Sequence, residues 1–162
     1  MPCQKTDSVC HTATVLALNT AMRNNELRLL KWKQVDLQER AVTIGHSKTE
    51  AGTGRVIPLN LQAFEALVKW ANGFPQAKPV HYVFPWRENH RVILSRPVSS
   101  WRTAWWNALK RAGVKCRFHD LRVTAINKLS EGQASGHTIM AIAGHVSRRM
   151  LEHYSRLRTA KL

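Results

Sequence analysis

The sequence predicts an α+β fold that is mainly α-helical, with a small antiparallel β-sheet or hairpin. Two observations support this fold class. Apolar residues recur at helical intervals in several stretches, for example at Val9, Ala13 and Leu16. The segments AVTIGH and RVIPL flank SKTEAGTG, whose glycines suit a hairpin connection. With 162 residues and 44% hydrophobic content, the chain can form one domain with its own core, which we expect to span residues 1–162.

The first half of the chain is predicted to contain helices on both sides of this hairpin. Residues 1–7 carry no periodic pattern and are expected to be a frayed start. A first helix is predicted from Ser8 to Asn19 or Thr20, and a second from Asn24 or Asn25. The second helix is expected to bury Leu27, Leu30 and Trp32. The strands follow within residues 41–59, and an amphipathic helix follows over residues 61–71.

The second half begins with a short extended piece, HYVFP, and a basic loop, RENHRV. A helix is then predicted from Pro97 to Ala112, with Pro97 near its first turn and Gly113 at its end. Its tryptophans, Trp101, Trp105 and Trp106, lie at helical spacing, which favours core packing over stacking on DNA bases. Another helix is predicted over residues 119–130.

Composition indicates a polyanionic partner. Lys and Arg number 25 against 10 Asp and Glu, which gives a formal net charge of +15. No apolar run approaches the roughly 20 residues that span a bilayer, and the first residues do not show the pattern of a signal peptide. Double-stranded DNA is therefore favoured over a membrane surface. The basic excess is largest over residues 61–118, and the side chains expected to face DNA are Arg102, Lys110, Arg111, Lys115 and Arg117.

The cysteines and histidines do not predict a metal site. Cys3, Cys10 and Cys116 cannot all pair within one chain, which indicates reduced thiols and a cytoplasmic location. Cys3, Cys10 and His11 are close in sequence, but no second pair with zinc-finger spacing follows. We expect no metal and no cofactor.

The stretch from His119 to Tyr154 contains the candidate chemistry. On a helix, His119 and Arg122 lie three residues apart on one face, so both can reach the same phosphate. The alternative is an amphipathic helix with one solvated face. Gly144 interrupts the following apolar run, and a new helix can begin near Ser147. Tyr154 on that helix has the spacing of an ordinary buried aromatic.

Four segments together resemble the tyrosine recombinases, the phage integrase family. They are LNTAMRNNELRLLKWKQVDL, HSKTEAGTGRVIPL, HDLR and GHVSRRMLEHYSRLR. The resemblance runs from about Val15 to Arg158 and implies the catalytic-domain fold of that family. One position departs from the family pattern, since Ala21 replaces the usual glycine before Met-Arg. Because Ala disfavours positive φ, we expect a slightly different turn before Arg23.

The resemblance implies a catalytic set for breaking and rejoining DNA strands through a 3′-phosphotyrosyl intermediate. Its members are Arg23, Lys48, His119, Arg122, His145 and Tyr154. In this set Tyr154 is the nucleophile, Lys48 protonates the leaving oxygen, and the arginines stabilise phosphate charge. Without the resemblance, Lys48 would be an exposed turn lysine. Glu26 either favours the helix dipole or supports the site.

Three functions remain open: a site-specific recombinase or integrase in DNA recombination and DNA integration, a type IB topoisomerase, and an inactive DNA-binding relic. Relatives normally carry an N-terminal core-binding domain, which we expect to be absent from this chain. They act as tetramers on DNA, whereas this isolated domain is expected to be monomeric.

Overall fold

The structure is a computed structural model that describes residues 4–89 and 91–144. Its helices are α1 (Gln4–Thr20), α2 (Asn24–Arg28), α3 (Leu61–Ala71), α4 (Arg102–Ala112), α5 (Phe118–Glu131) and α6 (Gly136–Ala143), with 3-10 turns at Trp32–Gln34 and Glu50–Gly52. Its strands are β1 (Val35–Asp36), β2 (Ala41–Thr43), β3 (Val56–Pro58), β4 (Pro85–Glu88) and β5 (Arg91–Pro97). The predicted α+β class, mainly helical with small antiparallel sheets, is confirmed.

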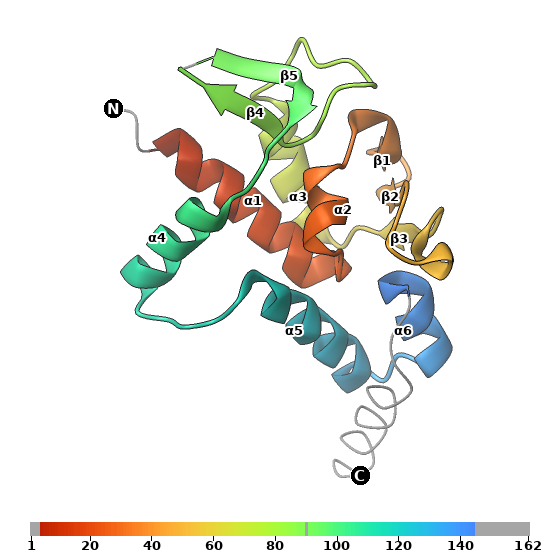
Figure 1. Ribbon diagram of the computed structural model, residues 1–162. Coiled ribbons are helices and arrows are strands. Elements are labelled where there is room, and N and C mark those ends of the chain that lie inside the picture. The colour runs from red at the N-terminus through yellow and green to blue at the C-terminus, as the bar shows by residue number, and fades with distance from the viewer. Residues whose placement is uncertain (1–3, 90, 145–162) are drawn as a thin grey trace.

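Helix α1 runs through the middle of the molecule and packs against α2, α3, α4 and α5 (Figure 1). Its residues Ala13, Leu16 and Ala17 are buried in the main core, together with Leu67 of α3 and Phe84. Helix α1 is therefore the central element around which the other helices pack, and its C-terminal end positions the turn that leads to α2.

Strands β1, β2 and β3 form an antiparallel sheet in that order. Val42 pairs with Ile57, and both side chains are buried. The hairpin predicted within residues 41–59 is thus confirmed, and the short strand β1 adds a third member that sequence patterning missed. Helix α3 also matches its prediction, because the Asn60 side chain accepts a hydrogen bond from the Ala63 backbone N–H at 3.0 Å and caps its start.

A smaller apolar cluster lies between α5, α6 and the turn after α1. It consists of Ala21, Ala125, Ile126, Ile139 and Ala143. Helix α6 also contacts β3, and Figure 1 shows it beside the loop between β2 and β3. This cluster therefore brings the end of α6, the end of α1 and the hairpin loop into one region.

The start of α1 differs from the prediction. The helix begins at Gln4 instead of Ser8, so residues 4–7 are helical and are not a frayed start. These residues lack apolar periodicity, but Gln and Lys are good helix formers and can extend a helix that the core already stabilises.

The predicted basic loop RENHRV is wrong. Within this segment, Arg87 and Glu88 belong to strand β4 and pair in antiparallel register with Val92 and Arg91 of β5. Asn89 has a φ of 44°, a conformation that Asn tolerates and that suits a tight hairpin turn. Pro97 consequently ends β5, and α4 begins only at Arg102.

The tryptophan that precedes α4 and the two within it differ in burial. Trp101 is buried, and Trp105 packs against the main core. Trp106 is 60% exposed and lies under the Lys110 ammonium, 5.3 Å from the ring centroid. Core packing is therefore confirmed for the first two tryptophans and does not apply to Trp106.

Candidate active site

Arg23 lies in the turn between α1 and α2, as the sequence predicts. Its backbone N–H donates to Glu26 Oε2 at 2.8 Å, which satisfies one of the donors at the start of α2. Its side chain donates through Nη1 to Glu26 Oε1 at 2.9 Å and to Ser47 Oγ at 3.2 Å. The guanidinium is therefore held at the helix N-terminus by a carboxylate and by the hairpin loop.

Glu26 is the centre of this network. Its carboxylate also accepts from Arg55 Nη1 and Nη2 at 3.0 and 2.6 Å, and from the Ser47 hydroxyl at 2.6 Å. Burial raises the pKa of Glu26, but the hydrogen bonds from Arg55, Ser47 and the Arg23 backbone outweigh it and hold the pKa at about 2. The carboxylate is thus ionised at neutral pH and holds both arginines in place.

Arg55 is a site residue that the sequence analysis missed. It precedes β3 and its side chain is 5% exposed. Besides Glu26, it donates through Nη1 to the Gly52 carbonyl at 2.6 Å and through Nε to the Ile142 carbonyl at 2.9 Å. Along the strand it has the same parity as the buried Ile57, and this alternation was a usable signal that its side chain points inward.

Arg122 is buried on α5, and its side chain reaches two backbone carbonyls. It donates through Nη1 to Ala21 O, and through Nη2 to Ala143 O at 2.8 Å. Ala21 is two residues before Arg23, and Ala143 ends α6. The two arginines are therefore held at the same meeting point of chain segments, although they are far apart in sequence.

Gly144 completes this meeting point. A Cβ atom at Gly144 would lie 3.2 Å from Gly52 Cα, 3.5 Å from Arg55 Nη1 and 3.6 Å from Arg23 Nη1. Its backbone has φ 73° and ψ −147°, a combination available essentially only to glycine. The absence of a side chain thus allows the end of α6 to approach the arginine pair, immediately before His145.

The other predicted catalytic residues are placed less fully. Lys48 is exposed on the loop between β2 and β3, next to the buried Ser47. His119 is exposed in the first turn of α5, three residues before Arg122. His145 and Tyr154 lie outside the described residues.

Ala21 adopts a left-handed backbone conformation, although its Cβ atom makes positive φ unfavourable. Its φ is 52°, so the turn before Arg23 takes the left-handed form despite the Cβ atom. That this turn differs slightly from the turn of the family stays a prediction. The conformation directs the Ala21 carbonyl to Arg122, and burial of the methyl group in the smaller cluster offsets part of the strain.

The five basic residues expected to face DNA are all exposed: Arg102, Lys110, Arg111, Lys115 and Arg117. Arg117 forms an ion pair with Asp120 at 2.8 Å, and the hydrogen bond from Arg117 lowers the pKa of that carboxyl. Its charge is therefore partly balanced within the protein.

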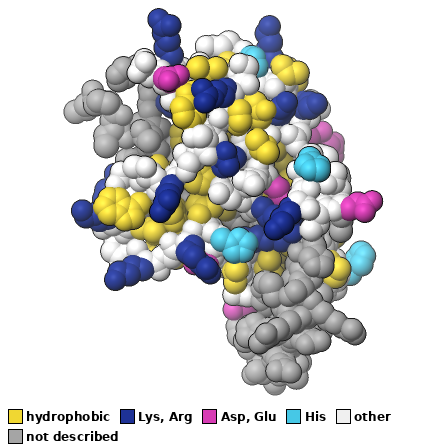
Figure 2. Space-filling model, viewed as in Figure 1, with side chains coloured by type: hydrophobic (Ala, Val, Ile, Leu, Met, Phe, Trp, Pro, Cys, Tyr) yellow, Lys and Arg dark blue, Asp and Glu magenta, His cyan; other side chains and the backbone are white. Residues whose placement is uncertain are grey.

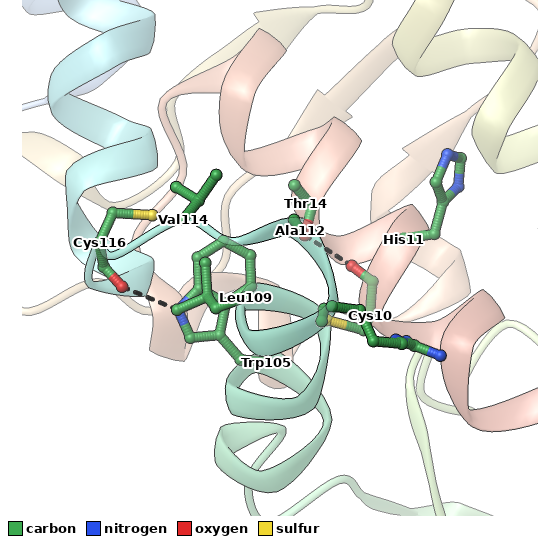
Figure 3. Close-up of a pocket in the computed structure, with 10 residues that line it drawn as sticks. Cys10, His11, Thr14, Trp105, Leu109, Ala112, Val114 and Cys116 are labelled. Carbon is green, nitrogen blue, oxygen red and sulfur yellow. Dashed lines mark hydrogen bonds between the residues drawn. The ribbon is translucent and has the colours of Figure 1, made fainter.

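A separate hollow of about 530 Å³ lies between α1 and α4 (Figure 3). Its wall includes Cys10, Thr14, Leu109 and Cys116, and none of the described catalytic candidates lines it. Figure 3 shows the two cysteines at opposite ends of this hollow. The hollow is therefore distinct from the arginine site.

Neither a metal centre nor a membrane span is found in the described part of the chain. Residues 4–89 and 91–144 contain no group of three His, Cys, Asp or Glu side chains placed to hold an ion. No helix among these residues is both long and apolar enough to cross a bilayer.

Comparison with known sequences identifies the family. The model of the phage integrase family matches residues 3–161. A shufflon-specific DNA recombinase from Escherichia coli is 33% identical over 149 residues, which cover 91% of this chain and 34% of the relative. The integrase of Salmonella phage P22 is 27% identical over 149 residues, which cover 87% of this chain and 37% of the relative. The chain thus spans about a third of the length of these two relatives.

Solved structures share the fold. The crystal structure of XerA recombinase matches with a TM-score of 0.72 and 23% identity, covering 96% of this chain and 56% of that one. The Tn1549 transposon integrase, in complex with circular intermediate DNA, matches with a TM-score of 0.71 and 18% identity, covering 100% of this chain and 64% of that one. The family match over nearly the whole sequence, on the fold of solved recombinases, shows that this chain belongs to the phage integrase family of tyrosine recombinases.

Proposed function

We propose that this chain is the catalytic domain of a site-specific DNA recombinase or integrase, which breaks and rejoins DNA strands through a 3′-phosphotyrosyl intermediate. The main support is the placement of Arg23 and Arg122. The Arg122 guanidinium donates to the carbonyls of Ala21 and Ala143. The Arg23 guanidinium, held by Glu26 and Ser47, lies beside Gly144. Proteins catalyse phosphoryl transfer mainly by positioning groups and by stabilising the charge on the phosphate oxygens, and two fixed arginines supply positioned positive charge.

The proposed reaction is a transesterification. The Tyr154 hydroxyl oxygen attacks the scissile phosphorus, and its proton passes to His119. The bond from phosphorus to the 5′ oxygen breaks, and Lys48 gives that oxygen a proton. Arg23 and Arg122 stabilise the non-bridging oxygens, with His119 and His145 as further donors. A second 5′ hydroxyl reverses the step, so the reaction needs no cofactor.

The exposed basic residues are proposed to bind the DNA backbone. Figure 2 shows Lys and Arg side chains spread over the face in view, with few acidic ones among them. Arg102, Lys110, Arg111 and Lys115 belong to α4 and to the segment that follows it. Replacing Lys115 with Gln should reduce the slope of log K against log salt by about 1 if it neutralises one phosphate.

The assembly and location are also proposals. We infer that residues 1–162 form one catalytic domain, that this chain alone is monomeric in solution, and that the full-length protein forms a tetramer on DNA in the cytoplasm. Sedimentation of this chain with and without a DNA duplex tests whether the chain alone is monomeric. A stable dimer without DNA would contradict it.

A covalent trapping assay tests the function. The protein is incubated with a nicked duplex from which the cleaved fragment diffuses away, and the products are separated on a denaturing gel. We expect a protein–DNA adduct that Tyr154→Phe abolishes. Tyr82→Phe is the matched control, because Tyr82 is the other of the two tyrosines and lies under Lys31, away from the arginine site. An adduct that persists in Tyr154→Phe would refute the assignment of the nucleophile.

A further inference from the structure

Arg55 connects three other parts of the site through one buried guanidinium. Nη1 and Nη2 bind Glu26 in α2, Nη1 also binds the Gly52 carbonyl in the hairpin loop, and Nε binds the Ile142 carbonyl in α6. A lysine presents a single ammonium and has no planar fork, so it cannot reproduce these directions. The geometry therefore depends on an arginine at this position.

The loop that carries Lys48 is held on both sides of that residue. Before it, the Ser47 hydroxyl donates to Glu26 Oε1 at 2.6 Å and accepts from Arg23 Nη1 at 3.2 Å. After it, the Gly52 carbonyl accepts from Arg55 at 2.6 Å. The two anchoring residues lie close together, because a Cβ atom added at Gly52 would lie only 2.5 Å from Ser47 Oγ.

Lys48 itself is exposed, so its position depends on the anchored loop on either side. We propose that Arg55 is a positioning residue that sets the Lys48 loop for protonation of the leaving 5′ oxygen. It does so from within the protein, through Glu26, Ser47 and Gly52. The inference rests on the proposed function.

This role can be distinguished chemically from a general loss of structure, because it predicts a defect that depends on the leaving group. A DNA 5′ alkoxide is a strong base and needs a proton as its bond to phosphorus breaks. If sulfur replaces that bridging oxygen, the leaving group is a thiolate, whose conjugate acid has a pKa of about 8.5 in a model thiol, and it departs unprotonated. A defect that acts through Lys48 should therefore largely disappear on the sulfur substrate.

The experiment measures single-turnover cleavage at saturating DNA, with oxygen and sulfur at the scissile 5′ position. For Arg55→Lys we expect the cleavage rate to fall roughly 10- to 100-fold on oxygen DNA, which raises the barrier by about one to two times 1.36 kcal/mol. On sulfur DNA we expect the rate to fall less than about 3-fold. Lys48→Ala should show the same pattern, and DNA affinity should change little. Arg28→Lys is the matched control and should leave both rates nearly unchanged, since Arg28 likewise donates to a backbone carbonyl, that of Val98 at 3.1 Å, but its described hydrogen bonds reach no part of the Lys48 loop.

A milder variant keeps the test valid if Arg55→Lys unfolds. Ser47→Ala removes the hydroxyl that anchors the other side of the loop and leaves the ion pair of Arg55 and Glu26 in place. It should show the same selective loss on oxygen DNA at a smaller size, roughly 3- to 10-fold.

Equal losses on both substrates, or no loss, would overturn the role of Arg55 while wild-type cleavage left the proposed function standing. If the wild-type protein forms no tyrosyl adduct with either substrate, the proposed function fails, and the inference fails with it.

Discussion

Replacing Glu26 with Gln tests the electrostatic centre of the site directly. The substitution keeps the size of the side chain and removes the negative charge that Arg23 and Arg55 share. The Gln amide is neutral, so the buried guanidinium of Arg55 loses its counter-ion. Removing one partner of a buried pair costs more than the pair contributes, since the other charge is left uncompensated.

The magnitude follows from the pKa of Glu26, which is lowered from 4.5 to about 2. A shift of this size corresponds to about 3 kcal/mol of folding free energy at neutral pH. The pKa is lower in the folded state, so this contribution is present in full above about pH 4.5 and is lost as the pH falls towards 2. We expect Glu26→Gln to destabilise the protein by about 3 to 4 kcal/mol at pH 7.

Urea unfolding followed by tryptophan fluorescence measures this difference. The gap in unfolding free energy between wild type and Glu26→Gln should shrink by about 2 kcal/mol, from about 3 to 4 kcal/mol at pH 7 to about 1 to 2 kcal/mol at pH 3. Glu65→Gln, at an exposed carboxylate of α3, should change stability by under about 0.5 kcal/mol. A gap for Glu26→Gln that is independent of pH would show that the carboxylate does not carry the stabilisation.

Three further substitutions test the backbone around the site, each by denaturant unfolding. Gly144→Ala should cost about 2 to 4 kcal/mol, because its φ and ψ exclude a Cβ that would also crowd Gly52 at 3.2 Å, whereas Gly136→Ala, with open space around it, should be nearly neutral. Ala21→Val should cost about 2 to 3 kcal/mol since a β-branched residue is strained at φ 52°; a neutral result would contradict the left-handed turn. Asn60→Ala should cost about 1 kcal/mol through loss of the α3 cap, and no change would mean that the cap is not formed.

Helix α3, the end of α4 and the first hairpin were predictable because local sequence signals fix them. Leu61–Ala71 has an apolar face at helical spacing and an Asn cap, and both signals agree on one boundary. Gly113 likewise ends α4 with a φ of 66°, as its position after the last periodic residue indicates.

The β4–β5 hairpin was missed because its local signals conflict. Arginines at both ends of the turn make the segment look like a basic loop, and Asn89 is not followed by the glycine that usually marks a tight hairpin turn. Partly buried Ile93 and Leu94 pack in a context that only the tertiary structure provides. The same context places Pro97 at the end of β5, so α4 begins only at Arg102.

Part of the candidate site could likewise be predicted from the sequence and part could not. Helical spacing already paired His119 with Arg122, but Arg23 and Lys48 could be selected from the sequence only through the family resemblance, whose motifs specify residue types in order. The partners of the arginines were not selected. The ion pair of Glu26 and Arg55 joins residues 29 positions apart, and strand parity could suggest that Arg55 points inward but not which acid it meets.

Arg122 shows why residue motifs alone do not define this site. Its described partners are the carbonyl oxygens of Ala21 and Ala143, which every amino acid would supply. What these positions require is small size, because the turn after α1 and the end of α6 must approach closely enough for one guanidinium to bridge them. The two arginines proposed to be catalytic are therefore aligned by small residues and backbone conformation. A chain that kept all six proposed catalytic residue types but enlarged Ala143 is expected to lose this alignment without losing a motif.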